Sequence, residues 1–226
     1  MDAGQNCMLR INVLTTATPR PELHEVTLKP TLDVLSKHFN VRWHVTVDDV
    51  LTDQPLALYE DTMKYLKTLS TGKTYLYPVD FKSFKLVAKK LYESISPEED
   101  DLFMWLEDDW ILQEDKIDDF ITAIKKFPGS DYDFIVTTIY KYIGGNPMVF
   151  RKKFFDPMQK YYLDTKKPID PELALWQIHS KMFGGRHKSN CQFLRDTFID
   201  AGRDWREERG IEKAHKKSHS DKTWKY

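Results

Sequence analysis

Short apolar runs alternate with helix-like stretches along most of this chain, and this alternation limits the possible folds more than any other feature. Residues 9–14 form a mostly apolar run typical of a buried strand, apolar side chains at helical spacing follow within 28–39, and residues 41–47 alternate between apolar and polar as a second strand would. Helices that separate buried strands favour a mainly parallel sheet. The sequence therefore predicts an α/β fold with a mixed, mainly parallel central sheet and helices on both faces.

The same pattern continues toward the carboxyl end. The further predicted elements are helices over 84–95 and 117–127 and strands over 102–106 and 134–139. Asp170-Pro171-Glu172 is typical of a helix start, so we expect a helix that runs through Trp176. Residues 51–80 are rich in polar residues and punctuated by proline and glycine, which predicts a long irregular connection with one short helix.

Composition narrows the class of protein. The 226 residues are enough for one sizeable core, and we expect residues 1–8 to be a flexible start and 9–202 to form a single domain. Lys and Arg number 34 against 35 Asp and Glu, so the whole molecule has no strong field for nucleic acid. No stretch approaches the roughly 18 apolar residues of a spanning helix, which argues against membrane insertion.

Cysteine usage and motif spacing exclude further classes. Cys7 and Cys191 cannot build a multi-bridge scaffold, so a reducing, cytoplasmic compartment is favoured, with one disulfide still open. The sequence has no G-x-G-x-x-G, no paired C-x-x-C, no H-E-x-x-H and no G-x-S-x-G. Hydride transfer, structural zinc and serine hydrolysis therefore lose support.

The strongest local signal is an acidic cluster, Glu107-Asp108-Asp109, inserted between the apolar run 102–106 and Trp110. Adjacent carboxylates at the end of a buried strand raise one another's pKa unless a cation neutralises them, and hard oxygen ligands suit Mg²⁺ or Mn²⁺. The alternative is an acidic turn that only caps the helix expected near residue 116. A bound divalent ion could hold a diphosphate and stabilise its charge as a sugar leaves.

Other groups could complete such a site. Asp170 and Glu172 are candidate general bases for an incoming hydroxyl, although Asp170 could equally be an N-cap. His215 and His219 are spaced to share a helix face and could supply metal ligands. Basic residues outnumber acidic ones in the segment 203–226, which could pack on or close over a diphosphate or be a solvated tail.

Taken together, these features resemble the GT-A class of nucleotide-sugar glycosyltransferases, which has a Rossmann-like domain. The resemblance rests on the acidic cluster, in the place of a D-x-D motif, and on the opening loop Asn12–Pro21. It implies a nucleotide-sugar donor, a glycan acceptor, Mn²⁺ or Mg²⁺ held chiefly by Asp109, and a catalytic base near Asp170. With the basic segment included, the nucleotide-binding candidates are Thr15, Thr16, Ala17, Thr18, Arg20, Asp48, Glu107, Asp108, Arg203 and Arg206.

Within that class, the opening loop and the pattern Ala201–Arg206 look most like the amino-terminal transferase domain of a chlorella-virus enzyme that builds capsid glycans. That narrower resemblance implies a UDP-linked or related rhamnose donor, transfer of a hexose or deoxyhexose with inversion, action in host cytoplasm, and linkage to further transferase domains. Two alternatives remain open: a metal-dependent nucleotidyltransferase and a non-catalytic glycan-binding module.

Overall fold

The computed structural model describes residues 8–47, 56–69, 73–77, 84–137, 147–169, 171–184 and 189–209. In this part of the chain a seven-stranded sheet has the order β3-β2-β1-β4-β7-β6-β8, and β5 and β9 form a second, two-stranded sheet. The strands are β1 (Arg10–Ala17), β2 (Asn40–Val47), β3 (Lys73–Tyr77), β4 (Leu102–Trp105), β5 (Trp110–Leu112), β6 (Phe134–Val136), β7 (Met148–Arg151), β8 (Cys191–Phe193) and β9 (Phe198–Asp200).

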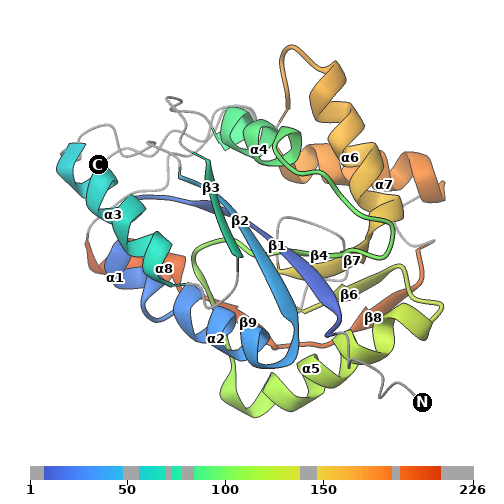
Figure 1. The fold of residues 1–226 in the computed structure, drawn as a ribbon, viewed down its shortest axis with the longest axis horizontal. Helices are drawn as coiled ribbons and strands as arrows, with labels where there is room; N and C mark the ends of the chain where they lie inside the picture. Colours follow the sequence, from blue (N-terminus) through green and yellow to red (C-terminus); the bar gives the residue numbers. More distant parts are fainter. Residues whose placement is uncertain are drawn as a thin grey trace, which may run out of the picture.

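Helices lie on both sides of the large sheet, and Figure 1 shows α4, α6 and α7 on one side and α2 and α5 on the other. The α-helices are α1 (Pro21–His24), α2 (Leu28–His38), α3 (Leu56–Thr68), α4 (Phe84–Glu93), α5 (Ile117–Lys126), α6 (Lys152–Asp164), α7 (Pro171–Phe183) and α8 (Gly202–Glu208). Short 3₁₀ turns, η1 (Glu114–Lys116) and η2 (Phe127–Gly129), flank α5. None of the described helices is long and apolar enough to cross a membrane.

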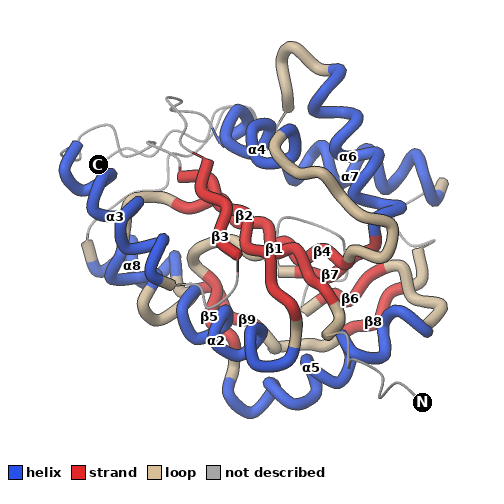
Figure 2. The backbone as a smooth tube through the Cα atoms, viewed as in Figure 1, coloured by secondary structure: helices blue, strands red, loops and turns tan. Residues whose placement is uncertain are grey.

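The sheet is mixed and mainly parallel, as the sequence predicts. β1 pairs in parallel with β2 along its whole length and with β4 on its other side, and β2 pairs in parallel with β3. β7 runs antiparallel between β4 and β6, and β8 is parallel to β6. The strands cross the centre of the molecule in Figure 2. Because β1, β2 and β4 are parallel, their carboxyl ends meet at one edge, which we call the C-terminal edge.

Two apolar layers hold the helices against the sheet. One layer packs the strand residues Val13, Trp43 and Met104 against α2, α3 and α5 and includes the small β5–β9 sheet. The opposite layer packs Leu14 and Phe103 against α4, α6 and α7. Both faces of the central strands are therefore dry, and a polar group at the C-terminal edge must find its partners locally.

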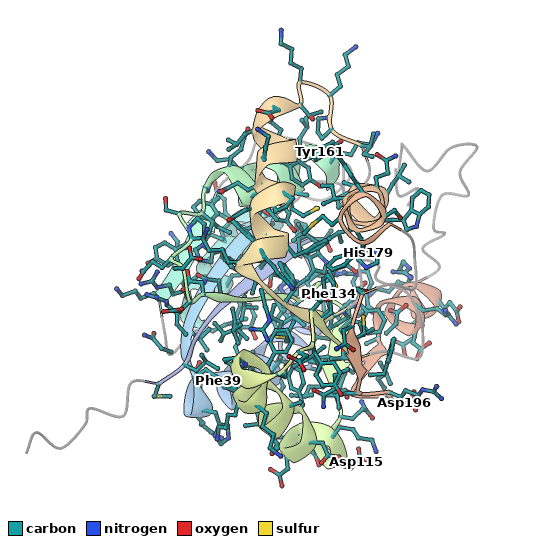
Figure 3. All side chains as sticks on the ribbon, turned by 90° about the vertical axis from the view of Figure 1, so that its right-hand side faces the viewer. Phe39, Asp115, Phe134, Tyr161, His179 and Asp196 are labelled. Atoms are coloured by element: carbon teal, nitrogen blue, oxygen red, sulfur yellow. The ribbon has the colours of Figure 1, made fainter. Side chains whose placement is uncertain are left out.

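Aromatic residues fill much of the second layer. Phe134 of β6 lies beside His179 of α7, with ring centroids 5.7 Å apart, and Figure 3 shows both in the packed interior. Asp115 and Asp196, in contrast, lie at the surface.

The prediction for residues 51–80 is wrong in one respect, because this region contributes a long helix and a sheet strand. α3 has thirteen residues. Its apolar stripe, Tyr59, Met63 and Leu66, packs into the same apolar layer as α2. β3 is an edge strand whose side chains are exposed or half-buried, so its apolar pattern is weak. The many polar residues of α3 make its helical spacing of apolar residues weak in the sequence. The edge position of β3 does the same for the alternation expected of a strand.

The other predicted elements lie close to their expected bounds, whereas no pattern in the sequence predicted α6, β5, β8 or β9. α2 begins at Leu28, so Pro30 falls in its first turn, where the missing N–H costs nothing. α7 begins at Pro171 and continues past Trp176 to Phe183. β6 covers residues 134–136 of the strand expected over 134–139, and residues 138–139 lie outside the described part of the chain.

Candidate functional site

The acidic cluster lies at the C-terminal edge, directly after β4. The Leu106 N–H still donates to the Leu14 carbonyl (2.9 Å), so the strand pairing with β1 continues until the cluster begins. Glu107, Asp108 and Asp109 then form a turn that leads into β5. The loop after β1 and the short helix α1 cross the same edge and bring Thr18, Arg20 and His24 to the cluster, from 84 to 90 residues away in the sequence.

Asp108 is enclosed by donors from that loop. Its Oδ2 accepts hydrogen bonds from the Thr18 N–H (2.9 Å), the Thr18 hydroxyl (3.2 Å) and Arg20 Nε (3.0 Å), and it lies 2.9 Å from His24 Nε2. Its Oδ1 accepts from Arg20 Nη2 (2.5 Å). The side chain is only 4% exposed. Both carboxylate oxygens are therefore engaged by this chain.

The Asp108–Arg20 pair is ionised. Burial by itself raises the pKa of Asp108, but the charge of Arg20 and hydrogen bonds from His24 and Arg20 outweigh it and hold the pKa well below its ordinary value. Burial disfavours the charge on Arg20 too, yet the charges of Asp108 and Asp109 raise its pKa above the usual range. The cation that the acidic cluster requires is thus supplied in part by an arginine of the chain.

The carboxylate charge of Asp109 is less fully neutralised by cations and hydrogen-bond donors than that of Asp108. Its Oδ2 lies 3.2 Å from Arg20 Nη2 and 3.8 Å from Arg206 Nη1, and its side chain is 18% exposed. Burial and the charges of Asp108 and Asp200 raise the pKa of Asp109, although Arg20 and Arg206 oppose that shift. Because burial is the largest cause of this shift, the ionised form of Asp109 is poorly solvated, and an added cation would stabilise it.

The donor set determines what kind of metal site this cluster could form. Glu107 is partly exposed, and its Oε2 lies 3.4 Å from Trp110 Nε1. Within the described ranges no group of three or more His, Cys, Asp or Glu residues is arranged to hold a metal ion. Mg²⁺-type sites for nucleotides use one or two carboxylates and take further ligands from substrate phosphates and water. Asp109 with Glu107 fits that partial kind of site. His215 and His219 lie outside the described residues.

α8 packs over the acidic cluster. The Ala201 N–H donates to the Asp109 carbonyl (2.8 Å), and Arg206 is almost fully buried beside Asp109. The guanidiniums of Arg20 and Arg209 lie over the Trp205 ring, at 5.5 and 4.5 Å from its centroid, and Trp205 Nε1 donates to Glu22 of α1 (3.3 Å). α8 thus joins α1 at this edge (Figure 1).

Gly202, the first residue of α8, allows this close approach. A Cβ at this position would lie 2.8 Å from both Cβ and Cγ of Asp109, which is closer than real side chains pack. The absence of a side chain therefore lets the helix sit directly on Asp109.

The remaining predicted nucleotide-binding residues differ in their burial and in their distance from the C-terminal edge. Thr15 is fully buried, and its hydroxyl accepts a hydrogen bond from Trp43 Nε1 (2.9 Å). Thr16 and Ala17 end β1 at the C-terminal edge, where Thr16 is paired with Thr46 of β2. The Thr46 hydroxyl is buried and has no hydrogen-bond partner in the part of the chain that the structure describes. Arg203 is exposed on α8.

The side chains of three predicted residues, in addition to those of His215 and His219, are not described by the structure. Asp48 and Asp170 lie outside the described residues, as does the side chain of Glu172. The structure therefore brings together the acidic cluster, the opening loop and α8, and the proposed base remains a prediction.

Sequence reasoning missed His24 and Gly202. No local signal marks them, because each acts on a residue more than 80 positions away. A histidine four residues after an arginine is ordinary, and a glycine at the start of a helix is usually a matter of backbone freedom rather than of contact.

The fold is that of the GT-A class, and comparison with solved structures supports this assignment. The chain is similar to the mannosyltransferase PcManGT from Pyrobaculum calidifontis, solved in complex with GDP-Man and Mn²⁺, with a TM-score of 0.57 and 10% identity over 88% of this chain and 60% of that one. It thus spans less than two thirds of that protein. An active-site mutant of LgtC gives a TM-score of 0.44 and 12% identity over 80% of this chain and 72% of that one. No protein-family model matches the sequence, and neither does any curated protein.

Proposed function

We propose that this chain is a glycosyltransferase that moves a sugar from a nucleotide-diphosphate donor to a hydroxyl of a glycan acceptor. One observation carries the proposal: in a GT-A fold, a buried acidic pair sits at the C-terminal edge, and burial keeps the pKa of one member, Asp109, raised although Arg20 lies 3.2 Å away. Ligands of open α/β sheets bind at that edge, and an under-compensated carboxylate there favours a cation and its bound phosphates.

We assign the metal ligands to Asp109 and, beside it, Glu107, with His215 and His219 as further candidates. Mn²⁺ or Mg²⁺ bound there would neutralise the charge that develops on the diphosphate as it leaves. The donor set favours this assignment because one or two carboxylates are what such nucleotide-bound ions take from a protein. The neighbouring Arg206 and the exposed Arg203 would add positive charge toward the diphosphate.

The nucleoside would lie at the ends of β1 and β2. Thr16, Ala17 and the backbone of the opening loop border this place, and the unpartnered Thr46 hydroxyl could hydrogen-bond a ligand there. Asp48 follows β2 directly and is a candidate for the ribose. Asp170, or Glu172, would accept the proton of the acceptor hydroxyl, which would make the transfer inverting.

The narrower resemblance supports a UDP-linked hexose or deoxyhexose as the donor and a viral capsid glycan as the acceptor. Linkage to further transferase domains comes from the same narrower resemblance and is part of the same proposal. Each of these finer assignments depends on donor binding at the C-terminal edge.

A thermal-shift screen of UDP, GDP and TDP, each with and without Mn²⁺, tests the function most cheaply. One nucleotide, with UDP favoured, should raise the melting temperature more with Mn²⁺ than without, because a ligand that binds only the folded state stabilises it. Product analysis then separates the alternatives: sugar transfer releases a nucleoside diphosphate, whereas nucleotidyl transfer releases pyrophosphate. No response to any nucleotide, with a response to glycans alone, would instead indicate a glycan-binding module.

A further inference from the structure

We propose that Arg20 is a positioning residue: its buried guanidinium fixes the acidic turn and holds the Asp109 carboxylate in place for the donor site. The inference rests on the proposed function, because it concerns how that site is oriented. It gives Arg20 and Asp108 a role other than direct contact with the nucleotide. Arg20 acts through the aspartates rather than on the substrate.

The guanidinium contacts both aspartates at once. Its Nε and Nη2 form a two-pronged pair with the two oxygens of Asp108, and the same Nη2 lies 3.2 Å from Asp109 Oδ2. A planar guanidinium holds such a pair in one geometry, whereas a lysine ammonium is a point charge without that fork. Arg20 thereby relates the direction of one carboxylate to that of the other.

The rest of the loop anchors Asp108 independently of Arg20. Thr18 donates twice to the Asp108 side chain, His24 contacts it from α1, and the Thr27 hydroxyl donates to the Asp108 main-chain carbonyl (2.7 Å). The segment 18–27 therefore contacts both the side chain and the main chain of Asp108. Because Asp109 follows Asp108 directly, these contacts also fix the backbone position of Asp109. Its carboxylate is then held by Arg20.

The partner on the other side of Arg20 is α8. Trp205 stacks over the Arg20 guanidinium at 5.5 Å, and Arg206 from the same helix reaches Asp109. One guanidinium thus contacts the acidic turn and the helix that covers it. A shift of Arg20 would disturb both, which is how a residue without substrate contact changes affinity.

A matched pair lies at the opposite end of the same strands. Arg10, at the start of β1, pairs through Nε with Asp101, just before β4, and also with Glu98 (2.7 Å). This pair ties the same two strands together but touches none of the candidate site residues. Arg10→Lys is therefore the control for Arg20→Lys, since both variants replace by an ammonium a guanidinium that pairs with a buried aspartate.

The experiment measures UDP affinity in the presence of Mn²⁺ by calorimetry, at a temperature where each variant is folded, together with its melting temperature. Both variants should melt earlier than the wild type. Arg20→Lys should bind UDP about 10- to 100-fold more weakly, the range found when the supports of a metal ligand are lost. Arg10→Lys should bind within about 2-fold of the wild type, because a merely structural pair leaves the affinity of the folded protein unchanged.

The outcomes separate the inference from the function. Wild-type affinity in folded Arg20→Lys would overturn the positioning role and leave the proposed function intact. Failure of the wild type to bind UDP or any other nucleoside diphosphate with Mn²⁺ would overturn the function itself. If Arg20→Lys does not fold, His24→Phe tests how the acidic turn is held, because it fills the same buried place without the contact to Asp108 Oδ2. We expect UDP binding to weaken several-fold, and unchanged binding in the folded variant would overturn the positioning role.

Discussion

Two arginine–aspartate pairs join β1 to β4, one at each end, and they differ in how their charges balance. At the amino end Arg10 and Arg42 face Asp101 and Glu98, two cations for two carboxylates, and hydrogen bonds from both arginines lower the pKa of Glu98. The C-terminal edge has Arg20 and Arg206 against a larger group of acids, Asp108, Asp109 and Asp200, and there burial, with the charges of Asp108 and Asp200, raises the pKa of Asp109.

The comparison shows why only one end is a candidate site. The same physical device, a guanidinium on a buried carboxylate, closes both ends of the strand pair. A balanced group needs nothing further, whereas a group with surplus negative charge in a buried place is stabilised by an added cation. We therefore place function where the charges of the described residues do not cancel.

The largest effect on stability should come from removing Asp108. Asp108→Ala leaves the buried Arg20 without its main partner, which costs about 3–5 kcal/mol of unfolding free energy. Asp101→Ala should cost less, about 1–3 kcal/mol, because Arg10 is partly exposed and keeps Glu98. Chemical denaturation at pH 7 measures both. An equal or larger loss for Asp101→Ala would show that the two ends are not distinguished by burial as we describe.

Acid titration should separate, by pH, His44 in the middle of β2 from the aspartates of the C-terminal edge. Burial, with the nearby charge of Arg42, lowers the pKa of His44 to about 4. The folded state therefore favours neutral His44, so its contribution is complete above the unfolded pKa near 6.5 and is lost as the pH falls toward 4, by roughly 3 kcal/mol. The contribution of Asp108, whose pKa is depressed, is lost only at lower pH.

His44→Gln should remove the first stage of this acid loss and leave the second. The measurement is the unfolding free energy at intervals from pH 8 to pH 3. A wild-type slope between pH 6.5 and 4 in the variant would mean that another group titrates there and would contradict the assignment of the first stage to His44.

A smaller effect should come from the contact between α8 and the acidic turn. Gly202→Ala places a methyl group against Asp109, and relieving that overlap should cost about 1–3 kcal/mol. Gly129→Ala is the matched control, because a Cβ there meets nothing within 4 Å, and its effect should stay within about 0.5 kcal/mol. Equal melting temperatures for the two variants would argue against the tight packing of α8.

Most of the fold could be predicted because its strands are buried on both faces and its helices carry regular apolar stripes. The parallel strands β1, β2 and β4 and the helices α2, α5 and α7 were all found from their patterns. The region of α3 and β3 was not, because an edge strand and a largely polar helix bury too little to leave a clear period.

From the sequence, the candidate site could be predicted only where charged residues interrupt an apolar segment. Three acids beside an apolar run mark the cluster in the sequence, but nothing local tells which of them is neutralised internally. That division depends on Arg20, which lies 88 residues from Asp108 in the sequence and meets it only because β1 and β4 are neighbours in the sheet. Sequence spacing therefore finds the acids and misses their counter-charges.

Calorimetric titration of UDP in the presence of Mn²⁺ against the wild type and Asp109→Ala tests the central claim most directly. If Asp109 holds the ion that anchors the diphosphate, the wild type binds UDP, and Asp109→Ala binds it at least about 100-fold more weakly. Removing a metal ligand should weaken binding at least as much as removing a residue that positions the ligand. Asp101→Ala, at the balanced end, should bind as the wild type does. Equal affinity in the wild type and Asp109→Ala would contradict the account.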